Sequence, residues 1–145
     1  MILRLYRIGA WLWIITGVGH NTIDVLARLF PSAAKEPVRA ALRNLPFELL
    51  GMSNNYYRLI MGFSLAMGTS IALAGVLFLL IAHLAADTAA RARPACFVGL
   101  AASVGLFALS AIVLQLPPPI VTFALASLAF AAALVGPTRA SVSRT

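Results

Sequence analysis

Two side chains capable of acid–base chemistry lie one helical turn apart near the N-terminus. They are His20 and Asp24, in the segment IGAWLWIITGVGHNTIDVLARLF. Residues at this spacing share one face of a helix, so the carboxylate can orient the imidazole and stabilise its charged form. General-base and metal-ligating histidines both require such a partner. Thr16 and Trp13 fall on nearly the same face, and these residues together form a first candidate site.

An ionised carboxylate inside a membrane-spanning helix needs a partner, because it costs roughly 2.5–3.5 kcal/mol on insertion scales. For Asp24 two interpretations stay open. Either Asp24 neutralises His20 or Arg28 and fixes the helix to its neighbours, or it belongs to an outward-facing polar pocket. The outer ends of the other predicted spans bring further polar groups to a similar depth. The candidate ligand-binding residues are therefore His20, Asp24, Thr16, Trp13, Gln115, Tyr56 and Tyr57.

No motif for a metal, a cofactor or a catalytic nucleophile accompanies this cluster. The sequence contains two histidines and one cysteine. Since the histidines fall near opposite faces of the membrane, they cannot share an ion, and no metal site is predicted. The sequence has no Gly-rich phosphate loop, nucleophile elbow or zinc-protease signature. Catalytic residues and cofactors stay unassigned.

The composition places the chain in a membrane. Hydrophobic residues make up 61% of the 145 residues and charged residues 10%, where soluble domains have about 25% charged residues. The net charge of +7 comes from cations dispersed at the ends of apolar runs, which favours contact with anionic lipid over nucleic acid. The expected partner is the lipid bilayer, with a homo-oligomer or a membrane partner subunit as open alternatives.

The apolar runs predict an all-α, polytopic membrane protein, a four-transmembrane-helix bundle in a single domain, 1–145. A span needs roughly 20 apolar residues. The last three segments meet this requirement with few or no charges, whereas the first must carry the polar sequence HNTID. No small-x-small cleavage site follows the first segment, so we expect it to remain as a helix. The predicted spans are about 5–30, 59–84, 95–116 and 120–136.

The connections between these spans have distinct predicted roles. Three consecutive prolines at 117–119 cannot continue a helix, so the chain is expected to reverse there. The interfacial segment, about 31–57, contains a short amphipathic helix in the first outer loop, between Pro37 and Pro46. The basic loop DTAARARP favours the cytoplasm, which puts both termini on the cytoplasmic side. Five cations on the opposite side reduce this bias: Arg28, Lys35, Arg39, Arg43 and Arg58.

A family resemblance accompanies this architecture. The Trp-rich first span AWLWIITGVGH, a long loop and then RLIMGFSLAMG resemble small uncharacterised bacterial four-helix membrane proteins, broadly similar to the DoxX-like proteins. The resemblance implies a four-helix fold and a bacterial inner-membrane location. It carries no catalytic residue onto this sequence.

Three functions fit these observations. The first is a small binding or accessory membrane protein whose outward-facing pocket around His20 and Asp24 takes a small amphipathic or lipid-like molecule. The second is a small membrane enzyme in which His20 acts as the acid–base group and Asp24 orients it. The third is a structural subunit of a membrane complex whose polar residues only fix the register of the helices.

Overall fold

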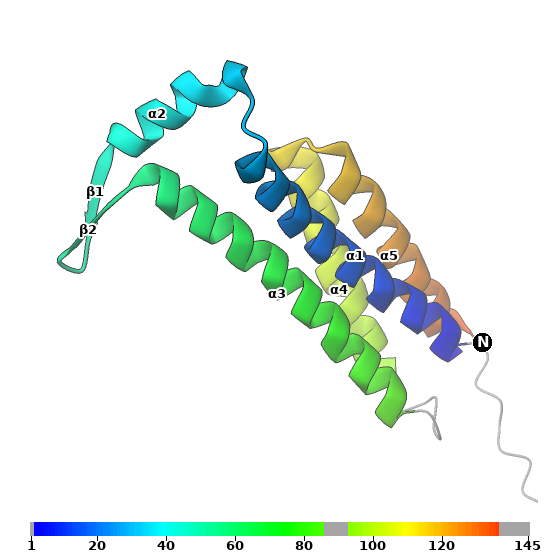
Figure 1. The fold of residues 1–145 in the computed structure, drawn as a ribbon. Coiled ribbons are helices and arrows are strands. Elements are labelled where there is room, and N and C mark those ends of the chain that lie inside the picture. The colour runs from blue at the N-terminus through cyan, green and yellow to red at the C-terminus, as the bar shows by residue number, and fades with distance from the viewer. Residues whose placement is uncertain (1, 86–92, 137–145) are drawn as a thin grey trace, which may run out of the picture. The chain divides into compact units, whose positions relative to one another are not determined.

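The fold is almost entirely helical, as the apolar runs predict (Figure 1). The computed structural model describes residues 2–85 and 93–136. The long helices are α1 (Ile2–Leu29), α3 (Tyr56–Leu84), α4 (Arg93–Leu109) and α5 (Pro117–Val135). The shorter elements are the 3₁₀ turn η1 (Ala33–Lys35), helix α2 (Glu36–Asn44), strands β1 (Pro46–Leu49) and β2 (Met52–Asn55), and the π-helical turn η3 (Ser110–Leu114).

Three helices are long and apolar enough to cross a membrane. They are Tyr56–Leu84, Arg93–Leu114 and Pro117–Val135, and at most 28% of their most apolar windows is buried inside the protein. Large apolar side chains therefore cover much of their outer surface, as expected for helices whose solvent is lipid. Helix α1 has 28 residues, but it is less apolar because three arginines and the HNTID sequence fall within it.

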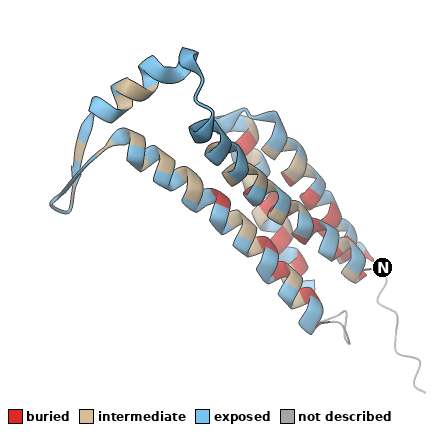
Figure 2. Ribbon diagram, in the orientation of Figure 1, coloured by how far each residue is buried: buried red, intermediate tan, exposed pale blue. Residues whose placement is uncertain are grey.

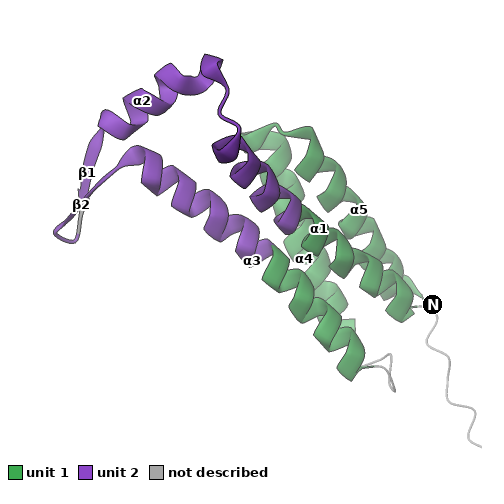
Figure 3. Cartoon of the chain, in the orientation of Figure 1, with its two compact units in different colours: residues 1–16, 72–145 green, residues 17–71 purple. Residues whose placement is uncertain are grey.

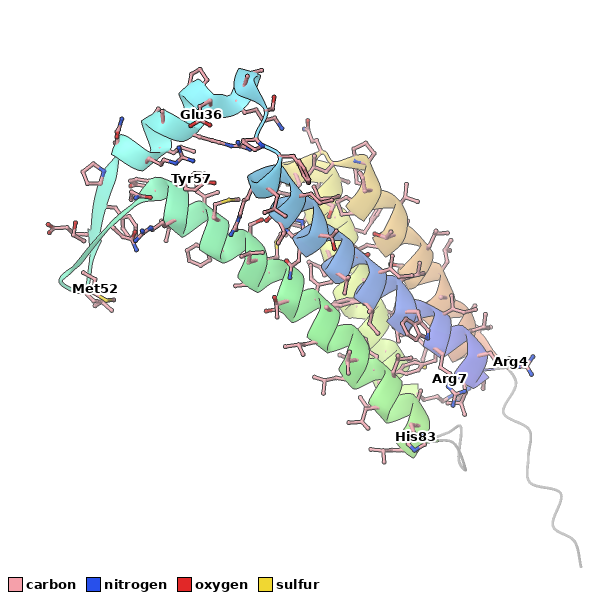
Figure 4. The ribbon with its side chains drawn as sticks, viewed as in Figure 1. Arg4, Arg7, Glu36, Met52, Tyr57 and His83 are labelled. Carbon is pink, nitrogen blue, oxygen red and sulfur yellow. The ribbon has the colours of Figure 1, made fainter. Side chains whose placement is uncertain are left out.

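Several residues on which the predicted topology depends lie outside the described residues. They include Arg91 of the basic loop, Pro137 at the expected end of the last span, and Arg139 and Arg144 beyond it. Arg4 and Arg7 lie on the exposed side of the first turns of α1, and Figure 4 labels both.

The chain reverses between α4 and α5 two residues before the position that the prolines predict. Gln115 has a left-handed backbone (φ 51°), and its N–H donates to the carbonyl of Ser110. The prolines then form the first turn of α5, which begins at Pro117 instead of near 120. A first helical turn tolerates proline because its N–H groups have no partner within the helix. The turn is therefore made by Gln115 and Leu116.

A β-hairpin precedes α3, and the sequence analysis did not predict it. Strands β1 and β2 pair antiparallel, with Leu49 opposite Met52. The turn residues Leu50 and Gly51 both have positive φ, 52° and 77°, as a type I′ hairpin turn requires. After β2 the side chain of Asn55 accepts a hydrogen bond from the N–H of Arg58 at 3.0 Å, which caps the start of α3.

The chain has two compact units (Figure 3). Unit 1 comprises residues 1–16 and 72–145, and unit 2 comprises residues 17–71. The boundary therefore falls within α1 and within α3, so each unit contains one part of both helices.

Buried positions are concentrated in unit 1 (Figure 2), and aromatic rings among them form its core. Tyr6 packs edge-on against Phe78 and Phe130, with ring centroids 6.1 and 5.4 Å apart. Trp13 packs in the same way against Phe78 and Phe123, at 5.5 Å in both cases. Such T-shaped pairs are favourable beyond the area they bury. This core connects the first part of α1 with the second part of α3 and with α5.

The ring of Phe130 packs directly against two glycines, Gly9 on α1 and Gly99 on α4. Its ring lies so close to Gly9 and Gly99 that a Cβ at either glycine would be only 2.8–3.0 Å from the ring atoms. Small residues let helix backbones approach in lipid, and here the ring of Phe130 fills the space that they leave.

We predict that Phe130→Ala lowers the free energy of unfolding of the protein in detergent by on the order of 3 kcal/mol, because it opens a cavity in the core. Phe97→Ala is the matched control, since Phe97 is 65% exposed and Phe130 is fully buried. Thermal unfolding followed by circular dichroism measures both. Equal losses for the two variants would show that unit 1 has no core around Phe130.

Candidate functional site

Unit 2 contains a polar cluster where α1 and α3 approach each other closely. The approach depends on Gly68, because a Cβ there would collide with the side-chain amide of Asn21 and lie 2.9 Å from Cδ2 of His20. His20 Nε2 lies 2.9 Å from Ser64 Oγ, and Asn21 Nδ2 donates to Thr69 Oγ1 at 3.0 Å. Two hydrogen bonds thus connect α1 with α3 inside unit 2.

His20 and Asp24 lie on the same side of the helix, but their geometry differs from that of a catalytic relay. Asp24 Oδ2 is 3.7 Å from His20 Nε2, which is beyond hydrogen-bonding distance. Ser64 contacts this same ring nitrogen. In a Ser-His-Asp triad the carboxylate holds Nδ1 while the serine contacts Nε2. In the arrangement seen here, Asp24 does not orient a histidine that activates Ser64.

Two acceptor oxygens of this cluster have no hydrogen-bond partner among the described residues. They are Oδ1 of Asn21 and Oδ2 of Asp24, both shielded from solvent. The side chain of Asp24 is only 18% exposed. Buried polar atoms in native proteins nearly always have a partner, and an unpartnered carboxylate oxygen is the most costly kind to bury. Asp24 is therefore set up to accept a hydrogen bond from a donor outside the described residues.

A cavity of about 180 Å³ lies beside Asp24 in unit 2. Figure 4 labels Glu36 on α2 and Tyr57 at the start of α3, which mark this end of the unit. An engineered cavity of about 150 Å³ holds a benzene molecule, so the space suits a small head group. The lining residues are Asp24, Ala27 and Arg28 from α1, Arg39 and Leu42 from α2, and Tyr57, Ile60 and Met61 from α3.

Helix α2 is held over this cavity by its arginines. Arg39 Nη2 donates to the carbonyl of Ala27 at 2.8 Å, so α2 is bonded to the end of α1. Arg43 bonds Glu36 at 2.9 Å, and its guanidinium lies 4.9 Å from the centre of the Tyr57 ring. The second contact is a cation–π interaction, and it connects α2 with α3.

The structure places the predicted site residues in different surroundings. Asp24 and Tyr57 line the cavity, and His20 lies beside Asp24. Trp13 belongs to the core of unit 1, where its Nε1 donates to Ser103 Oγ at 2.8 Å. The other three do not line the cavity. The hydroxyl of Thr16 donates to the carbonyl of Leu12, Tyr56 packs against Phe47, and Gln115 is exposed in unit 1.

Some residues of the site were assigned other roles in the sequence. In the sequence, Arg28 is a candidate charge partner of Asp24 and one of five cations that reduce the topology bias. Arg39 is only one of those cations, and Ser64 is not among the candidate residues. A signal for Ser64 is present, because a histidine inside a span needs a hydroxyl or amide on a neighbouring helix. No pattern in the sequence distinguishes Arg39 from the other arginines of its loop.

The lining suits charged organic groups better than a metal ion. Within residues 2–85 and 93–136, no three His, Cys, Asp or Glu side chains gather closely enough to hold a metal. The cavity presents one carboxylate and two guanidinium groups. Guanidinium groups bind phosphates and carboxylates, and a carboxylate binds ammonium groups.

We predict opposite effects for alanine at two glycines of α3. Gly68→Ala should lower the melting temperature, because the new methyl group displaces His20 and Asn21 and breaks hydrogen bonds worth on the order of 1 kcal/mol each. Gly62→Ala should leave it unchanged or raise it, since nothing lies within 4 Å of its Cβ position and alanine favours the helix. Unfolding in detergent measures both variants. A stabilised Gly68→Ala protein would contradict the close approach of α1 and α3.

Comparison with protein-family models, curated proteins and solved structures gives no match to this chain.

Proposed function

We propose that the chain is a small binding or accessory protein of the bacterial inner membrane, with four spans in a DoxX-like arrangement. Its cavity in unit 2 takes the polar end of a small amphipathic molecule. The observation that carries this proposal is the buried carboxylate oxygen of Asp24, which has no partner among the described residues and lies at a cavity lined by charged and apolar groups.

The length of α3 supports a cavity at the depth of the lipid head groups. Its 29 residues extend about 44 Å at 1.5 Å per residue, whereas the hydrocarbon core is about 30 Å thick. The helix therefore reaches beyond the hydrocarbon. Its charged end carries Arg58, and the cavity residues Tyr57, Ile60 and Met61 flank that position. A ligand there would have its head group among polar side chains and its apolar part in lipid.

Both faces of α1 support the proposal that it crosses the membrane in addition to α3, α4 and α5. Its exposed side carries large apolar residues at helical spacing, namely Ile8, Trp11, Ile15 and Val18. Two of the polar side chains that reduce its hydropathy have partners on α3, since His20 contacts Ser64 and Asn21 bonds Thr69. Polar groups with such partners are tolerated within a membrane. The first segment can therefore span the bilayer despite the HNTID sequence.

The geometry of His20 favours binding over the enzymatic alternative. The imidazole is held by Ser64 and does not lie among the residues that line the cavity. A general base must reach the proton that it removes. His20 is thus better suited to fix the position of α1, and Asp24 is the residue available to a ligand.

An even number of spans and the basic loop around Arg91 predict that both termini are cytoplasmic. A phosphatase fusion and a fluorescent-protein fusion, placed after Thr145 and at the N-terminus in separate experiments, report the side of each end. We expect phosphatase to be inactive and fluorescence to be present in both positions. Opposite results for the two ends would show that one predicted span does not cross, and that α1 is the first one to reconsider.

The cavity predicts that a bulky side chain in its wall expels the ligand without unfolding the protein. Ile60→Trp should abolish retention of a small amphipathic molecule, because the indole fills the space that the head group needs. Ile23→Trp is the control, since Ile23 is 65% exposed and does not line the cavity. Native mass spectrometry of protein extracted with its lipids measures retention. An unchanged ligand on Ile60→Trp would place the binding site elsewhere.

A further inference from the structure

We infer that the head group in this cavity is a zwitterion in which a primary ammonium group and a phosphate or carboxylate group are close together. This inference rests on the proposed function, since it names the chemical class of the ligand. It follows from two opposite charges of the cavity, each of which has unused hydrogen-bonding capacity among the described residues.

The anionic side of the cavity is Asp24. Its Oδ2 atom has no hydrogen-bond partner among the described residues. His20, one turn earlier on the same helical face, is 3.7 Å away and is engaged with Ser64 at 2.9 Å. Arg28, one turn later, has its Nη2 atom 3.5 Å from the carbonyl of Met61. A primary ammonium group offers three N–H donors on a compact charge. It would supply the hydrogen bond that Oδ2 of Asp24 lacks.

The cationic side is Arg39, whose side chain is only 15% exposed. Its one strong hydrogen bond goes to the neutral carbonyl of Ala27. The nearest carboxylate, Glu36, is 3.9 Å from it and is bonded more closely by Arg43 at 2.9 Å. Since a guanidinium has five N–H donors, most donors of Arg39 remain available to an anion.

Arg28 adds a second guanidinium to the lining. Its Nη2 atom lies 3.5 Å from the carbonyl of Met61, at the limit of a hydrogen bond. Two guanidinium groups around one oxyanion are a common arrangement for a phosphate or a carboxylate. The lining as a whole therefore offers two positive charges and one negative charge, which suits a head that carries both signs.

The lining also distinguishes a primary ammonium from a quaternary one. Choline-type groups have no N–H donors and are bound by cages of aromatic faces. Tyr57 is the sole aromatic residue in the lining, and Arg43 lies over its ring. A trimethylammonium group would therefore leave the carboxylate oxygen of Asp24 without a hydrogen bond.

The test is lipid addition to the full-length protein after its native lipids have been removed in detergent. Native mass spectrometry counts bound molecules of phosphatidylethanolamine, phosphatidylcholine and phosphatidylglycerol with identical acyl chains. We expect phosphatidylethanolamine to bind about tenfold more tightly than the other two, because each of them lacks one charge-assisted hydrogen bond. Glycerophosphoethanolamine, which has the same head and no acyl chains, distinguishes a water-soluble ligand from a lipid by competing only in the first case.

Single substitutions test the carboxylate of Asp24 and the guanidinium of Arg39 separately. Asp24→Asn should remove the preference for phosphatidylethanolamine over phosphatidylglycerol while binding of both persists. Arg39→Gln should weaken both lipids by the same factor, since both carry the phosphate. The matched controls are Glu48→Gln and Arg58→Gln, which remove one negative and one positive charge at positions that do not line the cavity. The lipid series on the unmodified protein decides the question even where a variant does not fold.

Each outcome has a distinct meaning. Equal binding of the three lipids, all lost in Ile60→Trp, would overturn the zwitterion inference and leave the proposed binding function intact. Binding that Ile60→Trp does not reduce, or no binding of any lipid or of glycerophosphoethanolamine, would overturn the proposed function as well. Tight binding of phosphatidylethanolamine that is lost in Ile60→Trp and loses its selectivity in Asp24→Asn supports both.

Discussion

The absence of water from the hydrocarbon core is the constraint on which this structure depends. Polar groups at membrane depth must find their partners within the protein. Helix α1 carries His20 and Asn21, and α3 provides Ser64 and Thr69 at matching positions. The two helices approach closely enough for these short side chains to meet because Gly68 has no Cβ. In unit 2 the close packing of these two helices and the hydrogen bonding of their polar side chains therefore depend on each other.

Local features of the sequence predict the long elements well. Helices α3, α4 and α5 follow from the length and hydropathy of their segments, which need no knowledge of the rest of the fold. The turns are harder to predict, because the left-handed positions at Leu50 and Gln115 are occupied by residues that rarely adopt this backbone. At the turn between α4 and α5 the usual signal, the run of prolines, lies two residues farther along the chain. At the hairpin, Gly51 is the one turn residue that usually adopts such a backbone.

The candidate site could be predicted only in part, because some of its residues have a local signal in the sequence and others do not. Asp24 is recognisable because it falls in a predicted span, where a carboxylate is costly. Arg39 is not recognisable, because an amphipathic pattern assigns all arginines of α2 to its polar face. Its bond to the carbonyl of Ala27 depends on the path of the chain between α1 and α2. The opposite charges that line the cavity thus come from segments whose meeting depends on tertiary structure.

The short turn between α4 and α5 has a consequence for how the protein is made. Two residues, Gln115 and Leu116, separate the π-helical turn η3 at the end of α4 from the prolines that begin α5. Few backbone amides of such a link require hydration, because Gln115 bonds Ser110 and the prolines have no N–H. We expect these two helices to enter a bilayer together as one hairpin, because a link this short leaves no hydrophilic loop between them.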